Sequence, residues 1–177
     1  VGETEIRTEQ KARDALDSEW NRLLDIDVWE MDKVQDAKLV AEMANQEKRT
    51  VHFGRVFEIC TEKNSELSGN DKRKKYKGRT VFQGNKVKDQ FQRAALFEDL
   101  GSAPASLAAS KMCDAYGLSP GHTLEQADAR QAYTQCLLES PNKTWVRLPR
   151  EREPLWWRKK YPDPVVPLNR NLYGHPD

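Results

Sequence analysis

The spacing of the apolar residues changes near residue 50 of this chain, and this change restricts the folds open to it. Residues 8–26 and 36–46 carry apolar side chains at three- and four-residue steps, which predicts two amphipathic helices. Residues 50–60 then alternate and are rich in β-branched and aromatic types, which predicts a strand. A turn-rich stretch separates it from a second candidate strand at residues 75–83. We therefore expect two helices followed by an antiparallel hairpin.

The second half of the chain follows neither pattern for long. Residues 83–100 are polar and irregular, and a helix is expected over residues 102–116, with Ser102 as its cap and Gly117 as its end. Next we expect a short strand, a helix and a strand over residues 123–128, 129–138 and 144–148. Because helices and strands do not alternate as in a doubly wound sheet, the expected fold class is α+β.

Composition and charge exclude several classes of function. The 177 residues are 37% hydrophobic and 32% charged, a polar balance that indicates long exposed segments or an uncovered partner surface. The chain has 29 Lys and Arg and 28 Asp and Glu, a net charge of +1. The net charge therefore does not indicate a nucleic-acid binder, and only the distribution of charge could. No Gly-x-Gly-x-x-Gly or Walker-type loop is present, and no Ser/His/Asp set stands out.

The cysteines and the apolar runs bear on location. Cys60, Cys113 and Cys136 are too widely spaced for a zinc site or a disulfide framework, which favours a reducing compartment. No apolar run reaches membrane-spanning length, and residues 1–10 are too charged for a signal peptide. We expect an intracellular chain without a membrane partner.

One carboxylate stands out by its position, in the segment QADARQAY at residues 126–133. Asp128 falls between the expected strand and the expected helix, and Tyr133 follows five residues later. A carboxylate at the end of a strand can hold a divalent metal against a phosphate, and a ring one helical turn further can form the floor of the pocket. The same spacing is also typical of an acid near the start of a helix and of a tyrosine packed in the core beside Leu137.

Other blocks along the chain give this segment its meaning. They are RVFEI at residues 55–59, KYKGRTVFQG at 75–84 and PLNRNLYG at 167–174, preceded by an acidic-aromatic segment at 18–30. Together with residues 126–133, and in this order, they resemble the reverse transcriptase of Ty1/copia-type retrotransposons. The family has RYKARLVAKG, QLDVKTAF and LKKSLYG at the corresponding places, and the resemblance covers nearly the whole chain.

The resemblance implies an RNA-directed DNA polymerase that extends a primer on an RNA or DNA template, using deoxynucleoside triphosphates and Mg²⁺. It implies that Asp128 is catalytic and ligates the metal. Tyr133 would lie beneath the incoming sugar, where its ring leaves no room for a 2′-hydroxyl. Arg79, and Lys77 on the same face of its strand, would hold the triphosphate.

The basic run at residues 72–79 has six cations in eight positions. Such a run is often only a solvated loop face, but this one enters a strand of the fingers block. The resemblance implies nucleic-acid contacts for Lys72, Arg73, Lys74 and Lys75, and a place nearer the template for Gln83 and Gly84. The segment WWRKKY at residues 156–161 mixes rings and cations, which suits either single-stranded nucleic acid or an anchored connector.

The resemblance also predicts the extent of the domain. The family's second catalytic motif, an aromatic-x-Asp-Asp turn, would lie beyond Gly174, and the sequence stops at Asp177. We therefore expect a helical extension at residues 1–48, then a truncated reverse transcriptase domain at residues 49–177. This domain would hold the fingers hairpin and the first part of the palm of a right-hand polymerase. Its partners would be the template-primer, the nucleotide and the remaining palm and thumb.

Two other interpretations of the chain stay open. One alternative is a non-catalytic nucleic-acid-binding or interaction domain left from a decayed retroelement, and another is a globular domain of cellular origin.

This assignment predicts a geometry. Asp128 should end a strand and point with Arg79 into one open cleft, and Tyr133 should lie in the first or second turn of the next helix. Apolar surface that further palm strands would cover should be exposed. Two departures from the family are Gly78, where alanine is usual, and an insertion at residues 33–49.

Overall fold

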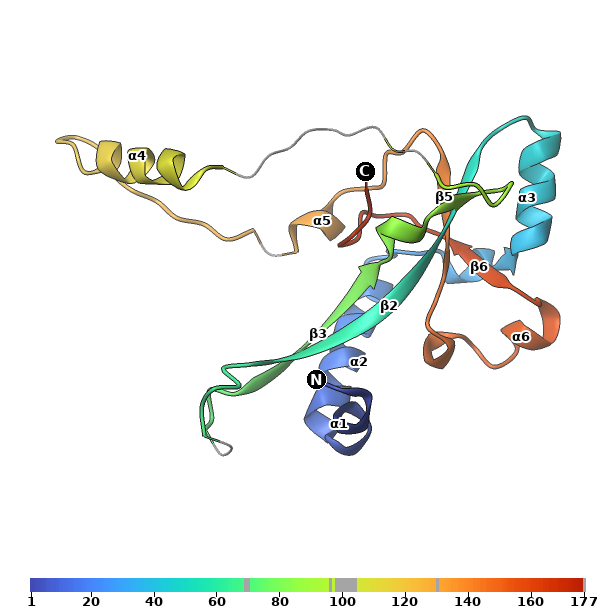
Figure 1. Ribbon diagram of the computed structural model, residues 1–177, viewed down its shortest axis with the longest axis horizontal. Coiled ribbons are helices and arrows are strands. Elements are labelled where there is room, and N and C mark those ends of the chain that lie inside the picture. Colours follow the sequence, from blue (N-terminus) through green and yellow to red (C-terminus); the bar gives the residue numbers. More distant parts are fainter. Residues whose placement is uncertain (69–70, 96, 98–104, 130, 177) are drawn as a thin grey trace.

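The computed structural model describes residues 1–68, 71–95, 97, 105–129 and 131–176 (Figure 1). The helices are α1 (Glu3–Thr8), α2 (Gln10–Asp25), α3 (Ala37–Gln46), α4 (Leu107–Gly117), α5 (Ala132–Gln135) and α6 (Trp157–Lys160). The strands are β1 (Gln35–Asp36), β2 (Val51–Lys63), β3 (Lys75–Phe82), β4 (Lys88–Asp89), β5 (Lys143–Arg147) and β6 (Pro164–Pro167). Single 3-10 turns lie at η1 (Met31–Lys33), η2 (Gly84–Lys86) and η3 (Arg150–Arg152). The expected α+β class is confirmed.

The strands form one curled sheet in the order β1-β6-β5-β2-β3, with β4 also paired to β2. The strands β2 and β3 pair antiparallel from Val56 opposite Phe82 to Lys63 opposite Lys75, which confirms the expected hairpin. At its other end β2 pairs in parallel with β5, from Val51 opposite Lys143. Figure 1 shows the hairpin projecting away from the rest of the sheet.

Two hydrophobic clusters lie on opposite faces of the central strands. One packs α3 against β2, β5 and β6 and holds Val40, Phe53 and Trp145. The other holds Trp20 and Leu23 of α2 together with buried residues of the strands and the C-terminal segment. Helices from residues 1–48 therefore share both cores with strands from residues 49–177, while the boundary at residue 48 stays a prediction.

The hairpin lies directly on the N-terminal helices, and Gly78 is the point of closest approach. A Cβ atom at Gly78 would lie 2.5 Å from the carbonyl oxygen of Ala15 in α2, so no larger residue fits. The alanine found at this position in the family that the sequence resembles would therefore not fit here. Nearby, the Tyr76 hydroxyl donates a 2.8 Å hydrogen bond to Glu5 of α1, which raises the pKa of the tyrosine to about 12. The helix expected over residues 8–26 is confirmed as α2, while the short helix α1 before it was not predicted; both pack beside the hairpin.

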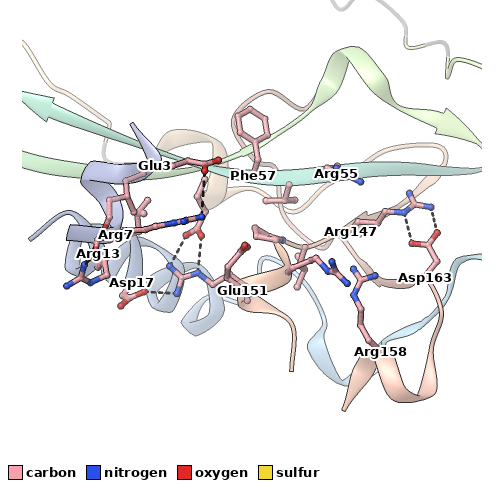
Figure 2. Close-up of a pocket in the computed structure, with 18 residues that line it drawn as sticks. Glu3, Arg7, Arg13, Asp17, Arg55, Phe57, Arg147, Glu151, Arg158 and Asp163 are labelled. Carbon is pink, nitrogen blue, oxygen red and sulfur yellow. Dashed lines mark hydrogen bonds and ion pairs between the residues drawn. The ribbon is translucent and has the colours of Figure 1, made fainter. Parts of the chain in front are cut away.

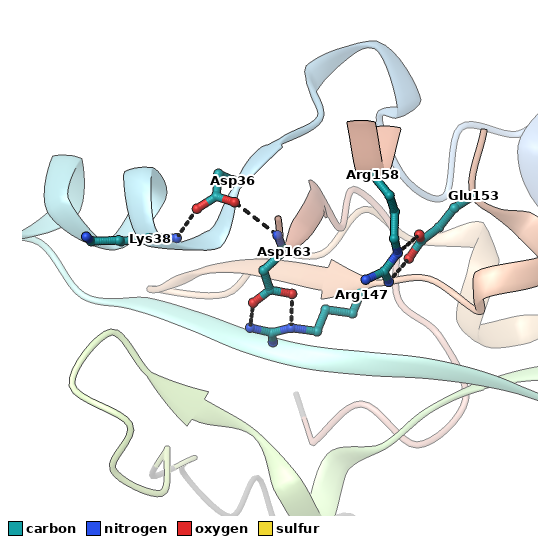
Figure 3. Close-up of polar contacts among 6 residues, drawn as sticks. All are labelled: Asp36, Lys38, Arg147, Glu153, Arg158 and Asp163. Carbon is teal, nitrogen blue, oxygen red and sulfur yellow. Dashed lines mark hydrogen bonds and ion pairs between the residues drawn. The ribbon is translucent and has the colours of Figure 1, made fainter. Parts of the chain in front are cut away.

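Asp36 begins α3 as expected and also joins it to the sheet (Figure 3). One carboxylate oxygen accepts the backbone N–H of Lys38 at 3.0 Å, and the other accepts the backbone N–H of Asp163 at 3.0 Å. Asp163 in turn holds Arg147, at the end of β5, through two hydrogen bonds of 2.8 and 2.6 Å. On α3, Val40 is buried, whereas Leu39 is 48% exposed.

The C-terminal segment packs against the end of β3. The backbone N–H of Phe82 donates to the carbonyl oxygen of Tyr173 at 2.8 Å, and the side chain of Leu172 is buried in the core. Gly174 has φ +86°, and a Cβ atom there would lie 2.3 Å from the carbonyl oxygen of Phe82. The last three residues of the PLNRNLYG block, residues 172–174, therefore pack against the end of β3, and Gly174 lets the two backbones approach closely.

Residues 105–129 form an arm that extends from the sheet (Figure 1). The helix α4 ends at Gly117 as expected, with Ser106 capping its start, whereas the expected cap Ser102 lies outside the described residues. The strand predicted at residues 123–128 was wrong, and the helix predicted at 129–138 is reduced to α5. A strand needs a neighbour for its backbone groups, and every residue from 121 to 129 is exposed. Within the described parts of the chain, no helix is long and apolar enough to cross a membrane.

Candidate nucleic-acid interface

One face of the β2–β3 hairpin is open and carries most of its cations. On β3 the side chains of Lys75, Lys77 and Arg79 are all exposed, because strand alternation directs them away from α2. Opposite them in register lie Lys63, Thr61 and Ile59 of β2. We call these six residues, together with Phe57, the basic face. Lys77 and Arg79 do share a face, as the sequence predicts.

The basic face combines charge with apolar surface. Phe57 and Ile59 are each 38% exposed. They lie on the same side of β2 as Val51 and Phe53. The helix α3 covers Val51 and Phe53 but leaves Phe57 and Ile59 uncovered. Cations beside exposed rings and aliphatic groups suit a nucleic-acid strand, because phosphates and bases can then be contacted together.

The four cations at residues 72–75, which were assigned to nucleic-acid binding, differ in their surroundings. Arg73 binds Asp71 through its side chain at 2.8 and 3.0 Å, which raises the pKa of Arg73. Lys74 forms an ion pair with Glu62 at 3.2 Å. Lys72 and Lys75 are exposed and form no ion pair with any residue that the structure describes. The charge available to a ligand is therefore that of Lys72 and Lys75, together with Lys63, Lys77 and Arg79.

At the base of the hairpin, Arg79, Tyr173 and Tyr133 form a connected set, which we call the tyrosine cluster. The Arg79 guanidinium carbon lies 5.8 Å from the centre of the Tyr173 ring. The Tyr173 ring is 4.8 Å from that of Tyr133, centre to centre, at 55°. Tyr133 is 55% exposed and lies in the first turn of α5, as expected. It is not the core residue that its helical spacing also allowed.

Backbone contacts hold the tyrosine cluster in place. The side chain of Arg170 donates to the carbonyl oxygen of Gln135 at 3.0 Å, and the Asn171 N–H donates to the carbonyl oxygen of Cys136 at 3.2 Å. Arg170 also bridges to Leu137 as in an antiparallel ladder. The segment leading to Tyr173 therefore fixes α5, and with it Tyr133. Gln83 and Gly84 follow β3 here, and the Gln83 N–H donates to the carbonyl oxygen of Arg55 at 2.8 Å.

Asp128 does not lie at the end of a strand. It is exposed, in an irregular segment before α5, and the predicted strand-to-helix junction is absent there. Among the described residues, no group of three or more His, Cys, Asp or Glu side chains is placed to hold a metal ion. Because Mg²⁺ prefers several oxygen ligands, a single exposed carboxylate does not make up the set that the resemblance implies.

The two tryptophans of residues 156–161 differ in role: one anchors the connector in the core, and the other is exposed as a nucleic-acid contact would be. Trp157 is buried in the main core, so it anchors the connector. Trp156 is 51% exposed, and its ring centre lies 6.3 Å from that of Tyr161. An exposed ring beside Arg158 and Lys159 remains available for stacking.

Sequence reasoning missed Tyr173 and Lys63 as site residues. Tyr173 lies within the PLNRNLYG block used for the resemblance, so the sequence did contain a reason to choose it. Lys63 could be found only from the register of the hairpin, because nothing in its sequence neighbourhood marks it.

Comparisons of the chain with protein family models, with curated proteins and with solved structures found no match.

Proposed function

We propose that this chain is the fingers and first palm segment of a copia-type reverse transcriptase, and that its basic face and tyrosine cluster bind nucleic acid or a nucleoside triphosphate. In the intact family such a segment serves template-directed DNA synthesis with Mg²⁺. We assign to this chain only the binding part of that activity.

One observation carries the proposal. Arg79, Tyr133 and Tyr173 come from three blocks that the resemblance singled out, and they lie in contact although they are far apart in the sequence. Convergence of separate motifs at one exposed place is what a binding site requires. Arg79 supplies a planar cation for phosphate oxygens, and the rings beside it supply a surface for a sugar or base.

The position of Asp128 favours a second candidate function. An exposed carboxylate outside any strand is consistent with a non-catalytic nucleic-acid-binding domain from a decayed element. Both candidates use the same basic face. They differ in whether a primer is extended.

The test is the binding of a labelled RNA–DNA duplex, followed by fluorescence anisotropy over a range of salt concentrations. The double variant K75Q/K77Q should bind more weakly, and its salt slope should fall by about 0.7–0.9 for each phosphate that the protein no longer neutralises. The matched control is R73Q/K74Q, which removes two cations that Asp71 and Glu62 already neutralise. Equally weakened binding in both variants, or unchanged binding in K75Q/K77Q, would contradict the proposal.

A further inference from the structure

A groove of about 910 Å³ lies beside β2, at the point where β5 ends and β2 continues without it. It is bounded by β2, by α1 and α2, and by the segment from Arg147 to Asp163. Its lining holds the arginines Arg7, Arg13, Arg55, Arg147, Arg150, Arg152 and Arg158 and the acids Glu3, Asp17, Glu58, Glu151 and Asp163. In Figure 2, Arg55, Arg147 and Arg158 lie toward one end of the groove and Arg7, Arg13 and Asp17 toward the other.

Three acids of the groove, Asp17, Glu58 and Asp163, are bound to particular arginines. Glu151 forms no ion pair with any described residue. Arg152 binds Glu58 through two 3.0 Å hydrogen bonds and binds Asp17 at 2.6 Å. Burial alone would lower the pKa of Arg152, but these bonds raise it above its ordinary value. Arg158 is held by Glu153, a nearly buried carboxylate, at 2.6 and 2.8 Å. These pairs fix the walls and leave their carboxylates little capacity for further cations.

Two arginines of the lining differ from the others in this respect. Arg55 and Arg150 are exposed, and neither forms a hydrogen bond or ion pair through its side chain with any residue in the described ranges. Arg55 stands directly beside Arg147 in the parallel register of β2 and β5. Like charges on neighbouring strand positions repel, and Asp163 is the carboxylate that balances Arg147. An anion entering at this end of the groove would relieve that repulsion.

We propose that this groove holds a phosphate-binding site, with Arg55 and Arg150 of its lining as the ligands, and with Arg147 and Arg158, each already paired with a carboxylate, as fixed neighbours. Two guanidinium groups can donate several hydrogen bonds to the oxygens of one tetrahedral phosphate group, which matches phosphate better than a single carboxylate. The phosphate comes either from free diphosphate or from the backbone of a nucleic-acid strand. These four arginines are not among the residues of the basic face, but Phe57 belongs both to that face and to the groove lining, so the two surfaces adjoin along β2. The site does not depend on the function proposed for the basic face.

The experiment measures binding of pyrophosphate by calorimetry and of single-stranded oligothymidylate by anisotropy, using the full 177-residue chain. In R55Q and R150Q we expect at least one probe to bind roughly 10- to 150-fold more weakly, because a charge-assisted hydrogen bond contributes about 1.5–3 kcal/mol. Weaker binding of pyrophosphate identifies a free diphosphate site, and weaker binding of the oligonucleotide alone identifies a strand-backbone site. K111Q, on the distant exposed helix α4, is the matched control.

Three results would overturn the site. The first is unchanged binding of both probes in R55Q and R150Q, and the second is an equal weakening in K111Q. The third is binding of poly-glutamate but of neither phosphate probe, which would indicate an acidic peptide instead. Circular dichroism melting should show both variants folded as the parent, since both side chains are exposed.

Discussion

At the scale of single residues, the three cysteines differ sharply in their surroundings. Cys60 is 3% exposed on the side of β2 that faces α2, and burial raises the pKa of its thiol. Cys113 and Cys136 are exposed. Because the thiolate is the reactive form, a thiol reagent such as dithionitrobenzoate should modify two cysteines quickly and Cys60 only after unfolding. The variant C113S/C136S should show no fast phase, and a third fast thiol in the parent would contradict the packing of α2 on the hairpin.

The site residues were predictable to different degrees. Arg79 and Tyr133 could be chosen from their blocks, and the structure brings both to Tyr173. Arg73 and Lys74 could not be separated from Lys75 by sequence, because their partners Asp71 and Glu62 become neighbours only once the loop and register form. The roles of Asp128 and of Mg²⁺ stay predictions from the resemblance.

At the scale of elements, Gly78 makes the contact between α2 and β3 possible. In G78A the new methyl group would meet the backbone of Ala15 and Leu16, which cannot rotate away. Overpacking of this kind costs about 1–3 kcal/mol, and each kcal/mol lowers the Tm of a chain this size by roughly 2–4 °C. Calorimetry should show this decrease in Tm.

The control for G78A is G2A, since nothing lies within 4 Å of a Cβ atom at Gly2. G2A should melt within about 2 °C of the parent, as surface substitutions usually change stability by under about 0.5 kcal/mol. If G78A melted like G2A, α2 would not lie against β3 in solution.

Elements with strong local signals were predicted well, and those that depend on distant partners were not. The hairpin and α3 carry clear alternation and a capping aspartate, and both formed as expected. The segment 123–128 reads as a strand by composition, but it lies outside the sheet. The parallel pairing of β2 with β5 could not be read from either strand, because nothing local specifies a partner so far along the chain.

At the scale of the whole molecule, the 177-residue chain should bind nucleic acid without extending a primer. Two-metal phosphoryl transfer needs carboxylates that bridge both ions, and the resemblance supplies only Asp128. Primer extension on a homopolymer template, with Mg²⁺ or Mn²⁺, should give no templated product. A retroviral reverse transcriptase on the same primer serves as the positive control. Templated product from this chain would favour the catalytic candidate over the binding domain.

The arrangement of β2 also governs the order in which this chain can fold. The hairpin closes between neighbouring residues, whereas the parallel pair joins Val51 to Lys143 across most of the chain. The entropy lost in closing a loop grows with its length, so the hairpin and its helices can form early and the middle of the sheet must wait for β5 and β6. During synthesis on the ribosome, the residues of the basic face therefore emerge well before β5 and β6, the strands that complete the sheet beside β2.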